Sequence, residues 1–301
     1  MYSQWYLFAL GIVISVFASK VMANEIKTGQ DQKTVQDLLA IKISVDQHTV
    51  QGSKISQGGG YDLTHSKIEV GNFLLSVSQE RFSVNWREID KLPFGKGITN
   101  PHSDFKRYQL KAHVPYRLDS QRMWLGHLGI EQATEKEQSD ALTLQGYLLY
   151  SEYFSPLHSW QLGAYISHHP VETLYLPIFE YTYNYPFKQR MGFYGHAGFP
   201  KTLIGYFITP KVRSEVGFYY HQAMVKLADQ SEIAPAGYFQ SKNWRMRWRT
   251  YYRYTPKLEM HIGIQASIAN ELRLYNRDYE MEGDYAVKHG VGMNLGMSYR
   301  F

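Results

Sequence analysis

The feature that most constrains this chain is a long, strict alternation of apolar and polar side chains. Over residues 242–254 the even positions carry Trp244, Met246 and Trp248, whereas the odd positions carry a run of arginines. Residues 258–268 and 290–301 alternate in the same way, with bulky apolar side chains opposite polar residues and glycines. A period of two is the period of a β-strand, in which successive side chains point to opposite faces. The pattern therefore predicts strands with one apolar face and one polar or charged face.

The length of these runs indicates which face is buried. They extend over about 11 residues, which suits a tilted strand that crosses a membrane, whereas strands of globular proteins are typically about 5 or 6 residues long. A dry core could not hold several unpaired charges per strand. Aromatic residues make up 15% of the chain, and such side chains suit membrane interfaces. We therefore predict an all-β fold, a single closed antiparallel transmembrane β-barrel with its apolar side chains outward.

Turn signals predict the number of strands. Short connections that contain Pro alternate with long polar ones, as expected for an outer-membrane barrel with short periplasmic turns and long outer loops. The long connections are residues 87–104, 133–141, 229–241 and 276–285, and residues 51–60 indicate a Gly-rich loop. Counting hairpins back from the C-terminus predicts about 14 strands, with both chain ends in the periplasm. Twelve is the alternative, because residues 62–86 can form one bent strand or two, and residues 191–208 are short for two crossings.

The first residues have the character of an export signal. An apolar run at residues 5–18 is followed by Lys20 and ends at Ala23, which predicts a signal peptide over residues 1–23, with an uncleaved anchor as the alternative. Residues 24–35 are then a polar periplasmic tail, and residues 36–301 form the outer-membrane barrel. The chain has no Cys, and its formal net charge of +5 is too small to indicate a nucleic-acid partner.

Two resemblances add to this interpretation. Residues 295–301 resemble the terminal assembly signal of outer-membrane proteins, an alternating strand that ends in aromatic-x-Phe, here Tyr299 and Phe301. This resemblance implies insertion by the barrel-assembly machinery. More widely, Leu176-Pro177 through Gly198-Phe199-Pro200, Thr209-Pro210-Lys211 and the closing Tyr299-Arg300-Phe301 are similar to a family of outer-membrane β-barrels classed as a domain of unknown function. That similarity implies the fold and a location in the cell outer membrane, and it carries over no catalytic or ligand-binding residue. Membrane lipid and lipopolysaccharide are then the expected partners.

A cationic ladder is the most distinctive candidate site. Arg245, Arg247, Arg249 and Arg253 would enter the lumen at two-residue steps of about 7 Å, an arrangement that suits anions. Residues on the neighbouring strands could pair with the ladder and close the lumen by salt bridges; they are Glu215, Tyr219 and His221 on one side, and Glu259, Glu271 and Arg273 on the other. Further positive charge would come from Lys111, His113 and Arg117 on another wall. A salt-bridged structural network and an open path for anions both remain open.

The sequence gives little support for an enzyme. Serine directly follows histidine at His65-Ser66, His102-Ser103 and His158-Ser159, but neighbours in a strand point to opposite faces, which argues against a catalytic pair. Two further groups have loose metal-ligand character, although solvated loops explain them more simply; they are His168, His169 and Glu172, and the acidic residues Asp278, Glu280, Glu282 and Asp284. We therefore expect no enzymatic activity, no metal and no cofactor, with a membrane-rim hydrolase as a remote alternative.

Two functions of different kinds fit these observations. The first is a small passive channel for polar or anionic solutes, lined by the arginine ladder. The second is a non-conducting barrel with a structural or surface-interaction role. Neither the solute nor the oligomeric state follows from the sequence.

Overall fold

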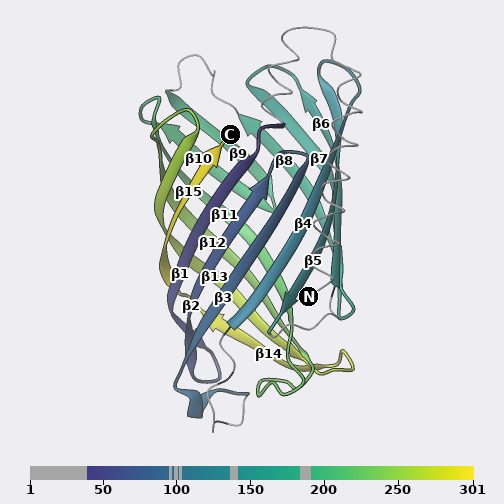
Figure 1. Cartoon of the computed structure of the whole chain (residues 1–301), viewed down its shortest axis with the longest axis vertical. Coiled ribbons are helices and arrows are strands. Elements are labelled where there is room, and N and C mark those ends of the chain that lie inside the picture. The colour runs from purple at the N-terminus through teal and green to yellow at the C-terminus, as the bar shows by residue number, and fades with distance from the viewer. Residues whose placement is uncertain (1–38, 95–96, 98–100, 102–103, 136–141, 184–190) are drawn as a thin grey trace.

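The computed structural model describes residues 39–94, 97, 101, 104–135, 142–183 and 191–301 (Figure 1). The predicted signal peptide and polar tail lie outside the described residues. The described part contains the short 3-10 helix η1 (Ile89–Lys91) and fifteen strands: β1 (Lys42–Ile55), β2 (Gly60–Gly71), β3 (Leu75–Arg87), β4 (Asp104–Arg117), β5 (Arg122–Thr134), β6 (Leu142–Tyr153), β7 (His158–His168), β8 (Thr173–Tyr183), β9 (Gly192–Phe199), β10 (Lys201–Phe207), β11 (Val212–Lys226), β12 (Tyr238–Arg253), β13 (Leu258–Tyr275), β14 (Met281–Lys288) and β15 (Val291–Arg300). In this part of the chain no helix has the length and apolar character needed to cross a membrane.

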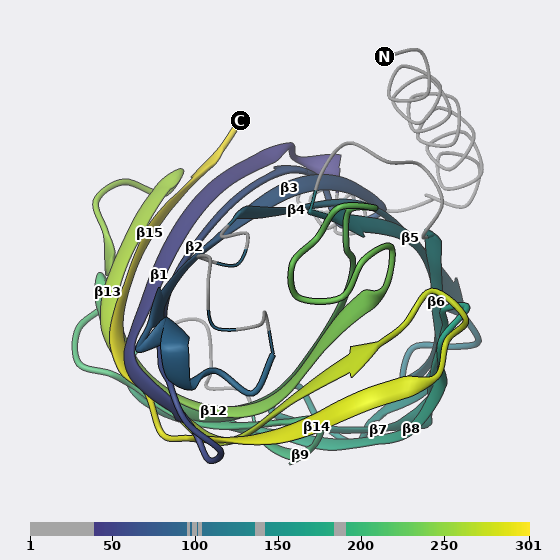
Figure 2. The same ribbon diagram turned by 90° about the horizontal axis from the view of Figure 1, so that it is seen from below.

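The strands form one closed antiparallel sheet. From β1 to β13 each strand pairs with its successor, and β1 closes the ring by pairing with β15. Both β14 and β15 pair with β13 on one side and with β1 on the other, so they are two halves of one wall strand that is interrupted at His289 and Gly290. The wall therefore has fourteen strands, which confirms the predicted barrel and excludes twelve. Figure 2 shows the ring along its axis.

The two ends of the barrel differ in their connections. At the turn end, short turns join β4 to β5, β6 to β7, β10 to β11 and β12 to β13. The start of β1 and the C-terminus also lie there, where the Phe301 N–H donates to the Ile41 carbonyl at 2.9 Å. The loop end carries the longer connections after β3, β5 and β11. The predicted loop at residues 51–60 is wrong at its start, because β1 continues to Ile55 through a bulge between Val50 and Ser53.

Three turn-end hairpins share the sequence Ser or Thr followed by Pro. The Thr209 hydroxyl accepts hydrogen bonds from the N–H groups of Lys211 and Val212 at 3.2 and 3.0 Å. Thr255 and Ser155 make the equivalent pair of bonds in their own turns. Pro presets φ, and the hydroxyl satisfies N–H groups at the corner of the turn. These two effects explain why the Pro motifs mark hairpin ends.

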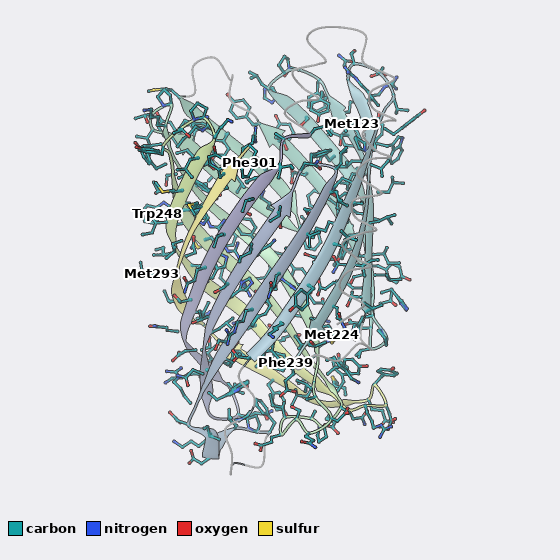
Figure 3. All side chains as sticks on the ribbon, in the orientation of Figure 1. Met123, Met224, Phe239, Trp248, Met293 and Phe301 are labelled. Carbon is teal, nitrogen blue, oxygen red and sulfur yellow. The ribbon has the colours of Figure 1, made fainter. Side chains whose placement is uncertain are left out.

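Large apolar side chains cover the outside of the barrel. Trp248 is 52% exposed and Met293 is 56% exposed, whereas Arg245, on the opposite face of β12, is 6% exposed. Figure 3 shows Trp248 and Met293 pointing away from the wall. A continuous apolar surface of this kind is unfavourable in water and favourable in lipid, and the closed sheet leaves no unpaired strand edge facing the lipid along most of the wall. The chain is therefore a transmembrane β-barrel of the outer-membrane type.

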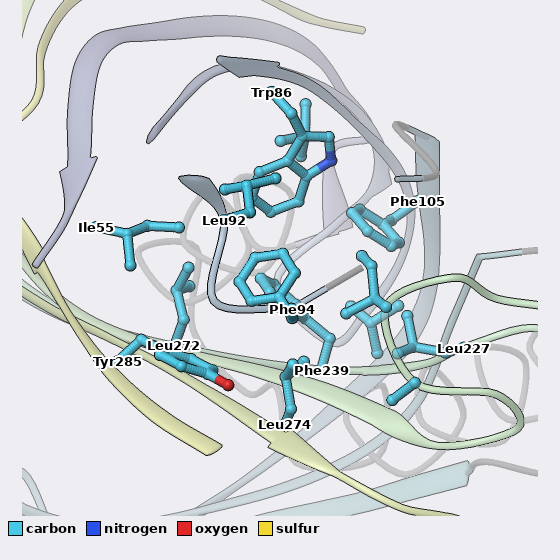
Figure 4. Close-up of a cluster of buried hydrophobic side chains, with 14 of the residues drawn as sticks. Ile55, Trp86, Leu92, Phe94, Phe105, Leu227, Phe239, Leu272, Leu274 and Tyr285 are labelled. Carbon is cyan, nitrogen blue, oxygen red and sulfur yellow. The ribbon is translucent and has the colours of Figure 1, made fainter. Parts of the chain in front are cut away.

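An apolar plug fills the loop end of the barrel. Leu92 and Phe94 follow η1, and Leu227 follows β11; both segments fold into the ring (Figures 2 and 4). The Phe94 ring lies 5.3 Å from the ring of Trp86 and 5.5 Å from that of Tyr285. Further buried members of the plug are Ile55, Phe82, Val84, Phe105, Ala133, Val225, Ile233, Ala234, Phe239, Leu272, Leu274 and Val287. Burial of one such large side chain contributes about 1.5–3 kcal/mol, so the plug is a substantial core.

A bulge in β13 reverses which face its residues occupy. The register between β12 and β13 skips one residue near Ile268. Beyond the bulge Leu272 and Leu274 point inward to the plug, and Glu271 and Arg273 point outward, where they bind each other at 3.0 Å. The prediction that Glu271 and Arg273 face the arginine ladder is therefore wrong, because one bulged residue moves every later side chain to the other face.

The wall is incomplete beside the short strands β9 and β10. Their hairpin ends at Pro200, so β8 pairs with β9 only from Phe179 to Tyr183, and β10 pairs with β11 only up to Tyr219. Residues 173–178 of β8 and 221–226 of β11 therefore continue toward the loop end with no part of β9 or β10 between them. We call this gap in the wall the window.

Candidate functional site

A polar cavity of about 780 Å³ lies inside the barrel, on the turn-end side of the plug. Positive side chains outnumber negative ones in its lining. Six are Lys or Arg (Lys67, Arg107, Lys111, Arg245, Arg247 and Arg249) and four are Asp or Glu (Asp46, Glu69, Glu80 and Glu131). The strand pattern explains the polarity, because the apolar side of each strand faces lipid and leaves the polar side for the lumen.

Three arginines of the predicted ladder line this cavity from β12. The Arg245 Nε donates to the Asn243 Oδ1 at 2.5 Å, and the Arg249 Nε donates to the Asn294 Oδ1 at 2.9 Å. The Arg247 guanidinium lies 5.2 Å from the centre of the Tyr219 ring, and its Nε is buried without a hydrogen-bond partner. Among the described residues, no Asp or Glu oxygen lies within the 4.0 Å of an ion pair from any of the three.

Of the carboxylates predicted to neutralise the ladder, Glu259 pairs with one ladder arginine, Arg253, and Glu215 binds two tyrosines. Glu259 forms a two-pronged ion pair with Arg213, at 2.5 and 2.9 Å, and lies 3.8 Å from Arg253. Within the described ranges Arg253 is thus the one ladder arginine with an ion pair, and it does not line the cavity. Glu215 accepts hydrogen bonds from the hydroxyls of Tyr194 and Tyr251, at 3.0 and 2.8 Å. Arg245, Arg247 and Arg249 therefore form no ion pair with either carboxylate, and the Tyr251 hydroxyl, which accepts from the Arg249 Nη1 at 3.4 Å, links Arg249 to Glu215.

A second charged group on the opposite wall was not predicted from the sequence. Glu80 on β3 binds Arg107 on β4 and accepts from the His65 Nε2 at 2.8 Å. Glu131 accepts from the side-chain amides of Gln109 and Gln145, at 3.0 and 2.9 Å. The sequence places these polar residues at inward positions of neighbouring strands, but which of them meet can be predicted only once the register between the strands is known.

The remaining predicted lumen residues divide into two groups. Lys111, His113 and His221 line the cavity, and His221 lies where the cavity meets the plug. Arg117 does not, because it is exposed at the turn end and its Nε donates to the Asp119 carbonyl at 2.8 Å. The prediction that Arg117 contributes to the lumen wall is therefore wrong, because Arg117 is the last residue of β4 and lies at the turn.

The histidine–serine neighbours show no arrangement for catalysis among the described residues. His65 binds Glu80 inside the barrel, whereas Ser66 is exposed on the other face of β2. His158 bonds to the Tyr181 hydroxyl at 2.5 Å, whereas Ser159 is buried. His102-Ser103 lies outside the described residues.

The two groups with metal-ligand character bind protein partners instead. No group of three or more His, Asp or Glu side chains within the described ranges is arranged to hold a metal. Glu172, in the turn between β7 and β8, accepts from the Gln240 amide at 2.6 Å and from the Lys242 ammonium at 3.1 Å. Burial by itself would raise the pKa of the Glu172 carboxyl, but these two hydrogen bonds and the charge of Lys242 lower it below its ordinary value. In the acidic segment, Asp284 belongs to strand β14 and binds Arg273 at 3.1 Å.

Comparisons with known proteins give weak similarities. No protein-family model matches the chain, and no curated protein matches it. Solved structures of similar shape include the KdgM porin, with a TM-score of 0.37 and 9% identity over 86% of this chain and 99% of that one. The NanC porin gives 0.38 and 10% over 86% and 100%, and Omp33 of Acinetobacter baumannii gives 0.40 and 11% over 88% and 100%. Similarities of this size carry no argument about solute or mechanism, and the family resemblance of the sequence stays a prediction.

Proposed function

We propose that this barrel is a passive channel for anionic solutes in the outer membrane, with its chain ends on the periplasmic side. The observation that carries the proposal is the row of Arg245, Arg247 and Arg249, which line the cavity and have no carboxylate partner among the described residues. A buried guanidinium is costly unless an opposite charge or water compensates it. In a path for anions the solute itself supplies that charge, and Arg offers planar donors that suit carboxylates and phosphates.

The plug favours a second candidate, the non-conducting barrel. Its apolar side chains fill the loop end of the lumen, so an axial path needs the segments after η1 and β11 to move. A static plug would leave the cavity as a closed vestibule, and the barrel would then serve an envelope or surface role through its wall and loops. The two candidates differ in one measurable property, which is ion conductance.

Planar-bilayer recording tests the proposal. We expect purified protein to give small current steps that favour anions, and we expect Arg247→Glu combined with Arg249→Glu to shift the selectivity toward cations. The matched control is Arg81→Glu combined with Arg122→Glu, which changes the net charge equally at positions exposed outside the cavity. The channel proposal is wrong if the Arg247/Arg249 double variant keeps the full anion preference of the wild type. It is also wrong if neither the wild-type protein nor a variant with a disrupted plug conducts ions.

A further inference from the structure

The window and the arginine ladder belong to one continuous cavity. Leu174, Leu176 and Ile178 project inward from the part of β8 that pairs with β7 but not with β9, and they line the same cavity as Arg247. Tyr220 and Gln222 line it from β11, on the other side of the gap. The six residues of β8 beyond its pairing with β9 extend over about 20 Å at about 3.3 Å per residue. The cavity therefore reaches the barrel wall at a place where no backbone ladder closes it.

The outer rim of the window is apolar and aromatic. On β8, the outward-facing Tyr175 is 71% exposed. At the tip of the β9–β10 hairpin, the Phe199 ring lies 6.5 Å from that of Tyr220 and 6.0 Å from that of Trp244, and these two rings lie 5.3 Å apart. Tyr and Trp gather where membrane lipid meets water. The window therefore opens on the lipid-facing belt of the barrel, close to the level of the lipid head groups.

On the loop side of the window, the backbone of Lys226 at the end of β11 pairs with Thr134 of β5, and side chains of the β7–β8 turn close the rest. Val171 in the β7–β8 turn packs against Met224 and Tyr238 of the neighbouring hairpin. Next to it, Glu172 binds Lys242 on the outward face of β12. The turn thus crosses over β11 and completes the rim. Contacts of this kind separate more easily than a strand ladder, because each ion pair or apolar contact is broken by itself.

The chemistry changes from apolar to cationic along this route. A solute entering through the window first meets three aliphatic side chains and then Arg245, Arg247 and Arg249, which form no ion pair within the described part of the chain. A free inorganic anion would gain nothing from Leu174, Leu176 and Ile178, and a hydrocarbon would gain nothing from Arg247. An acyl chain that carries one anionic head group satisfies both, since it buries apolar surface and supplies the missing charge.

We propose that the window is a lateral port through which a single-chain amphiphilic anion, a fatty carboxylate, passes between the membrane and the cavity. The tail lies along Leu174, Leu176 and Ile178, and the carboxylate reaches Arg247 and Arg249. This inference rests on the proposed anion site and deepens it by naming the class of solute and its direction of entry. A cavity of about 780 Å³ is within the range of about 300–1,000 Å³ for small-ligand sites, which favours one acyl chain over a two-chain lipid.

Binding of radiolabelled dodecanoate tests the port. The wild-type barrel is placed in nanodiscs of zwitterionic phosphatidylcholine, and its affinities for dodecanoate and acetate are compared. We expect dodecanoate to bind at least tenfold more tightly than acetate, and Leu176→Trp to weaken dodecanoate binding at least tenfold. The matched control Leu148→Trp adds the same ring on the lipid side of β6, where Leu148 is 55% exposed, and should leave binding unchanged.

A second variant removes any doubt about folding. The chain has no Cys, so Leu176→Cys can be folded first and then modified with benzyl maleimide, with Leu148→Cys treated alongside. Dodecanoate binding should fall at least tenfold only after modification of the Leu176→Cys variant. Equal binding before and after modification would overturn the port.

The outcomes separate the two proposals. If the Arg247/Arg249 variant changes chloride selectivity but dodecanoate binds no more tightly than acetate, the port is wrong and the channel stands. If chloride selectivity does not respond, the channel itself is wrong. A second experiment uses nanodiscs that contain phosphatidylglycerol and no dodecanoate. If this lipid co-purifies with the wild type but not with the modified Leu176→Cys variant, the port takes a phospholipid and the single-chain assignment is overturned.

Discussion

Individual side chains in this lumen handle charge in two ways. On the β2–β5 wall, Glu80 and Glu131 are buried among donors that satisfy them, including Arg107 and His65. On β12, Arg245 and Arg249 bind amides and Arg247 stacks on a ring, and none of these three forms an ion pair with a carboxylate in the described part of the chain. The first arrangement is a structural network, and the second leaves positive potential available to a mobile anion.

The structural network makes Glu80 a stability residue. Glu80→Gln removes the charge that compensates the buried Arg107, and loss of one partner of a buried ion pair typically costs about 3–5 kcal/mol. We expect a large fall in the urea concentration at the midpoint of unfolding in lipid vesicles, measured by the gel-mobility difference between folded and unfolded barrel.

Glu88→Gln is the matched control for that measurement. Glu88 binds Lys91 in the loop after β3, but both side chains are largely exposed, so solvent screens the pair. The midpoint of this variant should equal that of the wild type. Equal midpoints for Glu80→Gln and Glu88→Gln would show that the network does not stabilise the barrel.

At the scale of whole elements, the sequence predicts most of the wall. Period-two alternation identifies the lipid-facing side of β12 and β15, and the Ser/Thr-Pro turns mark the hairpin ends because their chemistry is local. The same logic puts Arg245, Arg247 and Arg249 on the inward face, and in the structure these three line the cavity. It fails for Glu271 and Arg273, because a single bulged residue leaves almost no trace in the pattern.

The plug and the window depend on contacts between distant segments. Leu92, Phe94 and Leu227 belong to connections that have no periodicity, so their sequence does not show whether they point into the barrel or into solvent. The shortness of residues 191–208 is visible in the sequence. Its consequence is a length of β8 beside the cavity that has no partner on its β9 side, and this appears only when the longer neighbours β8 and β11 are placed next to residues 191–208.

The plug segment after η1 yields a prediction about conductance. Leu92→Ser combined with Phe94→Ser replaces two buried plug side chains with small polar ones and weakens the packing against Trp86 and Tyr285. We expect single-channel conductance in planar bilayers to rise several-fold over the wild type. Lys91→Ser, at an exposed position of the same segment, is the control and should not change it. Unchanged conductance in the double variant would mean that these residues do not block the path.

The β7–β8 turn yields a prediction about access to the window. Glu172→Ala removes the acceptor of Gln240 and Lys242, so the turn should separate more often from β12. In a Leu174→Cys background we expect maleimide labelling to become about threefold to tenfold faster, as expected for loss of roughly 1 kcal/mol of partly buried hydrogen bonding. Glu152→Ala, on β6 near the turn end, is the control. Identical labelling rates with and without Glu172 would show that the turn does not limit access.

As a whole, the molecule presents different environments at different depths. Lipid surrounds the apolar belt, the polar cavity lies behind it, and the plug forms a dry core at the loop end. The plug resembles the interior of a globular protein, so the barrel has two apolar regions, one turned outward to lipid and one turned inward. The assignment of inside and outside therefore cannot rest on apolarity alone, and it has to be tested at residues of the same type in the two regions.

Tryptophan fluorescence provides that test, because Trp248 lies on the belt with 52% exposure and Trp86 lies in the plug with 4%. Brominated lipid chains quench only rings that they contact. In vesicles of brominated lipid we expect Trp248→Phe to lower the quenched fraction of the total emission, because it removes a ring in contact with lipid. Trp86→Phe should raise the quenched fraction, because it removes an emitter shielded from lipid. The opposite pair of changes would place Trp86 against the membrane and Trp248 in the interior, and the orientation of every strand, with the lumen position of the arginines, would then be reversed.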